Sequence, residues 1–72
     1  MKSVELGNFV FTFQSNKLFR NGRNMSPLLK KEVKVFELPI VDILMENKTV
    51  LVVLEDQTIY YSDVNGDIKL KQ

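Results

Sequence analysis

The chain of 72 residues contains no cysteine, histidine, tryptophan or alanine. Without cysteine it cannot form a disulfide, and without cysteine or histidine it lacks the usual ligands of a structural zinc site. The residue types that most often act as nucleophile or general base are also missing, so we expect no enzyme. Because alanine is the best helix former, its absence beside many Val, Ile, Leu and Phe favours strands.

Segments that would direct the chain to a membrane are also missing. The sequence does not open with a signal peptide, and no apolar run approaches the roughly 20 residues of a membrane-spanning helix. We therefore expect a cytoplasmic protein without membrane contact. The length predicts one small domain, residues 1–72. The core of such a domain rarely supplies more than roughly 3–5 kcal/mol, so oligomerisation is the remaining source of support.

Charge is divided unevenly along the chain. Residues 1–36 carry seven Lys or Arg against two Glu, whereas residues 37–72 carry three Lys against seven Asp or Glu. The net charge of +1 therefore hides two halves of opposite sign. This division indicates a surface that binds a charged partner, and a second copy of the chain is one such partner.

The C-terminal half predicts a meander of four strands. Asn65-Gly66 is a strong hairpin signal, because both central residues of a type I′ turn need positive φ. Asn47-Lys48 and Asp56-Gln57 are weaker turn pairs. The expected strands are Pro39–Glu46, Thr49–Glu55, Thr58–Val64 and Asp67–Lys71.

Two-residue turns between these strands would sort the side chains onto two faces. Ile43 would then lie opposite Val52, and Val52 opposite Tyr61. The face that we expect in the core would consist of Val41, Ile43, Met45, Val50, Val52, Leu54, Ile59, Tyr61, Ile68 and Leu70.

The opposite face of this meander is polar at its rim and apolar at its centre. In the same register Leu44 lies opposite Leu51, and Val53 lies opposite Tyr60. An apolar patch of this kind needs a cover. Either the N-terminal half folds over it, or a second subunit or another protein does.

The N-terminal half also carries strand patterns. Phe9, Phe11 and Phe13 alternate with smaller residues, which indicates a strand that faces the core. Ser15-Asn16 and Asn21-Gly22 are its two turn signals. For the segment from Ser26 to Leu38 we prefer a loop followed by a strand over Glu32–Leu38, with a short helix that begins at Pro27 as the alternative. The fold class is thus all-β, a small antiparallel sandwich, roll or SH3-like barrel built from hairpins.

A basic cluster occupies the middle of the N-terminal half. In a hairpin that turns at Asn21-Gly22, Arg20 and Arg23 would lie directly opposite each other, where like charges repel. An anion or an acidic partner between the two guanidinium groups would compensate, unless both side chains point into water. The cluster consists of Lys17, Arg20, Arg23, Lys30, Lys31 and Lys34.

These features favour a non-enzymatic interaction module, of the adaptor or inhibitor type, that binds a protein partner and self-associates. No catalytic residue, cofactor or metal ion is expected, since the acidic run from Asp63 to Asp67 lacks the spacing of a calcium loop. The candidate partner-binding residues are Leu44, Leu51, Val53, Tyr60, Arg20 and Arg23. The alternative is a nucleic-acid-binding domain that contacts phosphates through Lys17, Arg20, Arg23, Lys30 and Lys31.

Overall fold

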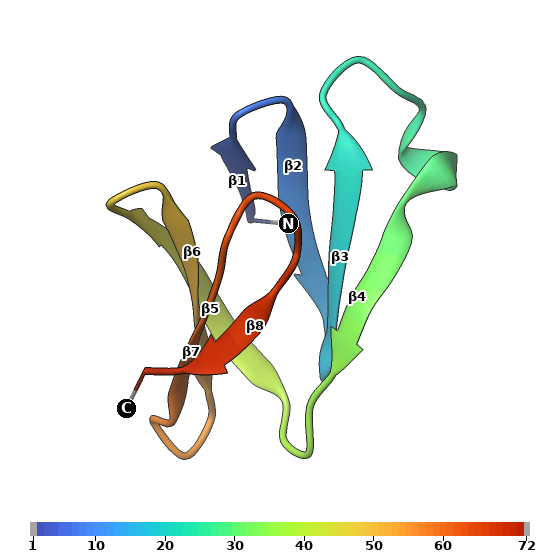
Figure 1. Ribbon diagram of the computed structural model, residues 1–72. Coiled ribbons are helices and arrows are strands. Elements are labelled where there is room, and N and C mark those ends of the chain that lie inside the picture. The colour runs from blue at the N-terminus through green and yellow to red at the C-terminus, as the bar shows by residue number, and fades with distance from the viewer. Residues whose placement is uncertain (1, 72) are drawn as a thin grey trace.

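The structure is a computed structural model that describes residues 2–71, and it consists of two four-stranded antiparallel sheets (Figure 1). In both sheets the strand order follows the chain order, so each sheet is a simple meander. The N-terminal sheet contains β1 (Ser3–Leu6), β2 (Phe9–Gln14), β3 (Lys17–Gly22) and β4 (Lys31–Val35), with a 3₁₀ turn, η1 (Pro27–Leu29), between the last two. The C-terminal sheet contains β5 (Ile40–Glu46), β6 (Thr49–Leu54), β7 (Ile59–Ser62) and β8 (Ile68–Leu70). The predicted all-β fold class is confirmed.

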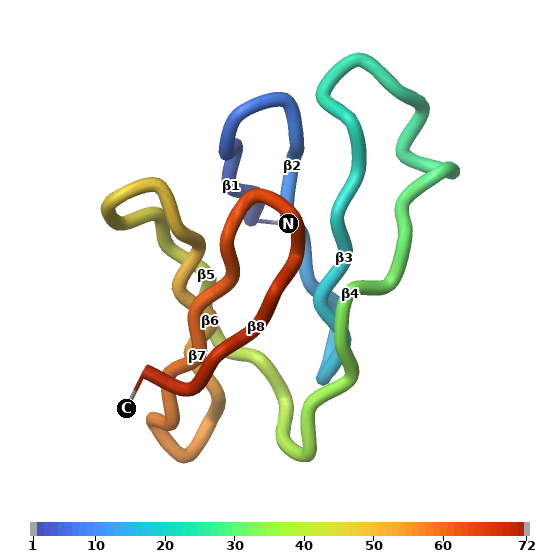
Figure 2. Tube along the Cα trace, in the orientation of Figure 1, coloured from blue at the N-terminus to red at the C-terminus, as the bar shows by residue number. Residues whose placement is uncertain are grey.

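The core lies between the two sheets, where one face of each is apolar. Phe11 and Leu18 from the N-terminal sheet and Ile43, Val50 and Val52 from the C-terminal sheet are completely buried there. The closest approach of the sheets brings β1 and β2 against β5 and β6. The trace in Figure 2 shows how the linker after β4 carries the chain from one sheet to the other.

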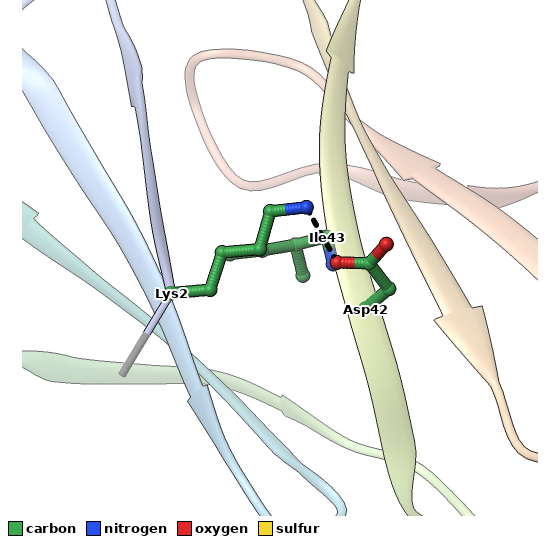
Figure 3. Close-up of polar contacts among 3 residues, drawn as sticks. All are labelled: Lys2, Asp42 and Ile43. Carbon is green, nitrogen blue, oxygen red and sulfur yellow. Dashed lines mark hydrogen bonds and ion pairs between the residues drawn. The ribbon is translucent and has the colours of Figure 1, made fainter.

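Among the described residues, two side-chain hydrogen bonds between the sheets lie outside this core. At the first, Lys2 donates a hydrogen bond from Nζ to Oδ1 of Asp42 on β5 over 2.6 Å (Figure 3). At the second, the β7–β8 loop reaches the N-terminal sheet, where Arg20 donates from Nη1 to the carbonyl of Val64 over 2.7 Å. The side chain of Val64 also packs over Gly7, in the turn between β1 and β2. The two sheets are therefore tied together along β5 and at the β7–β8 loop.

The first turn of the C-terminal meander is as predicted. Asn47 and Lys48 have φ angles of 48° and 63°, as a type I′ turn requires. The predicted pairing of Ile43 with Val52 is confirmed.

The predicted register of β7 is wrong by one residue. The β6–β7 turn contains three residues rather than two, because Gln57 adopts a left-handed conformation with φ 72°. The amide of Leu54 therefore donates to the carbonyl of Thr58, and Val52 lies opposite Tyr60. Because side chains alternate along a strand, this shift exchanges the two faces of β7.

The β7–β8 turn is also one residue longer than predicted. Gly66, with φ 88°, supplies the left-handed residue, and Tyr60 lies opposite Leu70. The second shift cancels the first, so Ile68 packs against the core as predicted.

The predicted place of Val41 on the core face is also wrong. The register changes between Ile40 and Asp42, which makes Val41 the extra residue of a β-bulge. Ile40 therefore points into the core, whereas Val41 is exposed.

In the N-terminal sheet the predicted turn at Asn21-Gly22 is wrong. The Ser15-Asn16 turn forms and pairs Phe13 with Leu18, so β3 runs on until Gly22 lies opposite Phe9. Pairing along the whole length of β2 therefore outweighs the local turn preference. The segment after it contains both expected alternatives, the η1 turn capped by Ser26 and a strand, β4, that is shorter than predicted.

Candidate functional site

The candidate site is the connection between β3 and β4 together with the strand ends that flank it, residues 20–31, here called the basic tip. In Figure 1 this connection projects at the top right, away from the C-terminal sheet. Asn21 holds it in shape by donating from Nδ2 to the carbonyl of Ser26 over 2.9 Å. The amide of Arg23 donates to the carbonyl of Asn8, and the hydroxyl of Ser26 accepts from the amide of Leu28. The loop is therefore anchored by side-chain and backbone hydrogen bonds.

Three large apolar side chains of the basic tip face solvent. Leu28 is 91% exposed, Met25 56% and Leu29 55%. Leu28 and Leu29 belong to η1, which has no buried residue. Because the loop around them is held by hydrogen bonds, their exposure comes with a defined backbone rather than with an unfolded segment.

A hollow of about 300 Å³ lies on one side of the loop. Phe9, Met25 and Leu29 form its apolar lining, and Arg20 and Lys31 supply its charge. The guanidinium of Arg20 lies 4.2 Å from the centroid of the Phe9 ring. Such a cation–π contact fixes the position of Arg20 while leaving its charge in place.

A second hollow of about 260 Å³ lies on the other side of the same loop. Val10 from the sheet and Met25 and Pro27 from the loop line it, with Arg23 and Lys30 among its charged residues. Lys30 places Nζ 4.4 Å from the centroid of the Phe19 ring. Arg23 pairs with Glu5 at 3.2 Å between Nη2 and Oε1, and both side chains are about half exposed. Both hollows therefore combine an apolar lining with positive charge.

The structure separates Arg20 from Arg23, contrary to the predicted hairpin. Arg20 lies opposite Lys31 in the sheet, whereas Arg23 follows the end of β3. Of the five cations proposed for nucleic acid, four belong to the basic tip. Lys17 stands apart, because it pairs with Gln14 next to the Ser15-Asn16 turn at the other end of β3.

The apolar candidates of the C-terminal half also divide. Leu44, Leu51 and Val53 lie on the face of the sheet that points away from the core, as predicted. Tyr60 does not, because the shifted register turns it inward, where its ring centroid is 5.0 Å from that of Phe36. Ile59 and Tyr61 occupy its expected place, opposite Val53 and Leu51 respectively. We call the resulting set the outer face: Leu44, Leu51, Val53, Ile59 and Tyr61.

One carboxylate at the edge of the outer face has a perturbed pKa. The hydrogen bond from Lys2 lowers the pKa of Asp42. The charge of Lys2 and the hydrogen bond from the amide of Ile43 lower it further, whereas partial desolvation raises it.

Within residues 2–71, no three acidic side chains gather as a metal-binding group. Asp63, in the acidic run, instead accepts from the amides of Asn65 and Asp67.

Sequence reasoning missed the exposed apolar residues Met25, Leu28 and Leu29. The available signal was Ser26-Pro27, which marks the start of a helical turn too short to bury the leucines that follow it.

No protein-family model, curated protein or solved structure matches this chain. In the part of the chain that the structure describes, no helix has the length and apolar character needed to cross a membrane.

Proposed function

We propose that this protein is a non-enzymatic interaction module that binds a protein partner through the basic tip and also self-associates. The observation that carries the proposal is the exposure of Met25, Leu28 and Leu29 on an ordered loop that also bears positive charge. Exposed apolar anchors beside Arg are typical of protein-binding surfaces. We place the module in the cytoplasm, as the sequence predicts.

The chemistry of the basic tip selects the kind of partner. Arg20 and Lys31 stand at one hollow, and Arg23 and Lys30 at the other. A segment that carries both carboxylates and large apolar side chains would match the two hollows, because the carboxylates pair with the cations while the apolar groups cover the leucines. The expected partner is therefore an acidic amphipathic segment of another protein.

The test is a titration of the isotope-labelled protein with synthetic peptides, followed by amide NMR. An acidic peptide that contains Leu and Phe should shift the resonances of residues 20–31. Leu28→Ser and Arg23→Glu should each weaken binding about tenfold, as expected for a central contact of a small interface. Lys17→Glu is the matched control, since Lys17 lies outside the basic tip and its change should leave the affinity unaltered.

Two results would contradict this proposal. The first is the absence of shifts with every acidic peptide, and the second is a set of shifts confined to the C-terminal sheet. A peptide with the same apolar residues but lysine in place of the acids should not bind, because it meets the cations of the tip with like charge.

Nucleic acid is the second candidate ligand of the basic tip. The observation that favours nucleic acid is that four cations lie around one loop: Arg20, Arg23, Lys30 and Lys31. A single-stranded or duplex oligonucleotide would then bind with an affinity that falls steeply as salt rises. Leu28→Ser should leave this binding unchanged, whereas it should weaken the binding of an acidic amphipathic peptide. The same variant therefore separates the two candidates.

A further inference from the structure

β4 is an edge strand whose outer side is open. It pairs with β3 alone, and the C-terminal sheet comes close to β1 and β2 rather than to β4. Four of its five residues, all except Val33, are exposed. In Figure 1 it forms the right-hand margin of the N-terminal sheet, with η1 just before its start. An open edge of this kind presents unpaired backbone N–H and C=O groups, onto which another strand can add.

The backbone direction at one residue of this edge follows from a neighbouring hydrogen bond. The amide of Phe36 donates to the carbonyl of Asn16, next to the start of β3, over 2.8 Å. Residues of an antiparallel pair alternate between those that bond to the partner strand and those that do not. Val35, which lies opposite Lys17, therefore directs its N–H and C=O away from β3. Val35 is also 47% exposed, so an added strand can reach it.

A β-bulge places the cations of this region on one face of the sheet. Lys31 lies opposite Arg20, and Lys34 lies opposite Leu18. Arg20 and Leu18 are two residues apart on β3, so they share a face. The register shift between Leu18 and Phe19 therefore brings Lys31 and Lys34 to that same face, although their spacing of three would put them on opposite faces of a regular strand. We call Arg20, Lys31 and Lys34 the cation row.

The cation row has no acidic partner among residues 2–71. The ion pairs in this part of the chain include none of its three members. Arg20 bonds instead to the neutral carbonyl of Val64, and Lys31 lines the hollow beside Arg20. Lys34 is exposed, with Nζ 5.7 Å from the centroid of the Phe36 ring. The three like charges on one face are therefore uncompensated, and carboxylates beside them would relieve their repulsion.

The other face of the same edge is more apolar. Phe19 lies opposite Glu32, and Val35 lies opposite Lys17, so these four residues share the face that points away from the core. Glu32 and Lys17 carry charges of opposite sign, whereas Phe19 and Val35 are apolar. A strand added to this edge would thus meet cations on one side and a largely apolar surface on the other.

We propose that the acidic partner segment of the basic tip binds in an extended conformation and adds to β4 as a fifth strand of the N-terminal sheet. Acidic residues at every second position would face the cation row, and the apolar residues between them would lie beside Val35 and Phe19. The segment would pass η1 at one end of β4, where Leu28 and Leu29 are exposed. This inference rests on the proposed function and adds the conformation and the residue spacing of the partner.

The cation row also makes a second copy of the chain a poor occupant of this edge. When two copies of one edge strand pair in antiparallel fashion, the two-fold axis is perpendicular to the sheet, so the same face of each copy lies on the same side. The two cation rows would then lie next to each other. Like charges at such positions destabilise a sheet, and lysines on an edge strand discourage pairing between copies. The edge therefore suits an acidic strand better than it suits itself.

Two synthetic peptides of equal composition test the spacing. In the first, Glu and Leu alternate, whereas in the second the same residues follow each other in pairs of one kind. The alternating peptide should bind at least about tenfold more tightly in an amide NMR titration, because only its acids all face the cation row. The shifts should extend from residues 20–31 into residues 32–35. The amide of Val35 should also exchange more slowly with solvent deuterium in the complex.

Methylation of single peptide nitrogens tests the backbone pairing without altering the protein. A strand directs alternate amides to its partner strand. Methylation should therefore weaken binding about tenfold at every second residue of the alternating peptide and change it little at the residues between. A peptide bound as a helix or as an irregular loop would not give a period of two.

Lys34→Glu tests the cation row, because Lys34 lies outside the basic tip. It should weaken binding of the alternating peptide about tenfold, since it replaces an attraction by a repulsion. Lys69→Glu makes the same change of charge on β8 and should bind like the wild type. Val35→Pro should also weaken binding, because it removes an N–H that points away from β3, whereas Val35→Ala keeps this N–H. Circular dichroism shows whether each variant keeps the fold.

The outcomes separate this inference from the proposed function. Peptide binding with shifts confined to residues 20–31 and no period of two in the methylation series would overturn the added strand, while binding at the basic tip would stand. Failure of every acidic peptide to bind would overturn both. If the amide of Val35 became protected without peptide as the protein concentration rises, a second copy would occupy β4, and the proposed partner would be wrong.

Discussion

The two sheets share one topology but dispose of their apolar residues differently. In the C-terminal sheet, β6 is buried from Val50 to Val52 and again at Leu54, so apolar side chains lie on both of its faces. In the N-terminal sheet, β4 is exposed along almost its whole length, and only one face of the sheet meets the core.

This difference explains why the two candidate surfaces have different forms. A strand that is apolar on both faces has one face outside the core when a single partner sheet packs against it, which gives the outer face, although its central Leu51 is only 8% exposed. The N-terminal sheet instead places its exposed apolar side chains on a loop, where Met25, Leu28 and Leu29 stand among cations. The first surface is part of a sheet, whereas the second is a projecting loop, which suits a short segment of a partner.

Truncation of a phenylalanine on each face of the N-terminal sheet should give the largest effect. Phe11 is completely buried, so Phe11→Ala should cost about 3–5 kcal/mol and leave this small domain largely unfolded. Phe19 lies on the face away from the core under Lys30, so Phe19→Ala should cost clearly less. Urea denaturation followed by circular dichroism measures both. Equal losses of stability would contradict the placement of Phe19 on the face away from the core.

Two glycines sharpen the comparison of the turns. Gly66 has φ 88°, so Gly66→Ala should destabilise the fold by about 1–2 kcal/mol. Gly22 lies within β3 without a positive φ, and an added Cβ would meet only the flexible side chain of Met25, so Gly22→Ala should change stability by less than about 0.5 kcal/mol. Thermal melting of the two variants provides the measurement. A larger loss of stability for Gly22→Ala would indicate that Gly22 has the positive φ of the turn that the sequence predicted at Asn21-Gly22.

The smallest expected effect concerns the ion pair that joins the two sheets. Since the pKa of Asp42 is lowered in the folded chain, its contribution to stability is present at neutral pH. That contribution is lost as the pH falls below about 4, where the carboxyl group becomes protonated. Asp42→Asn should remove this part of the pH dependence. Urea denaturation from neutral to acidic pH would reveal it, and parallel pH profiles for the variant and the wild type would contradict it.

Much of the C-terminal sheet could be predicted because its strands and turns are encoded locally. The alternation of apolar residues and the pair Asn47-Lys48 sufficed to place β5 opposite β6. The register of β7 could not be predicted, because it depends on whether Gln57 adopts a left-handed conformation, which glutamine seldom does. That single conformation decides whether Tyr60 or Tyr61 faces outward.

The basic tip was only partly predictable. The cations were evident from the sequence, but their arrangement depends on where β3 ends. The Ser15-Asn16 turn fixes the register of β3 against β2, and this carries the strand past Asn21 to Gly22. The residues Asn21-Gly22 alone cannot show this, because the end of β3 is set by its pairing with β2.

The composition of the outer face depends on the orientation of β7. Nuclear Overhauser contacts between aromatic rings test this most directly, since the ring centroids of Phe36 and Tyr60 are 5.0 Å apart. We expect strong contacts from the Phe36 ring to Tyr60 and none to Tyr61. Contacts from Phe36 to Tyr61 instead would show that β7 has the opposite orientation, with Tyr60 on the outer face in place of Ile59 and Tyr61, and would contradict the register of β7.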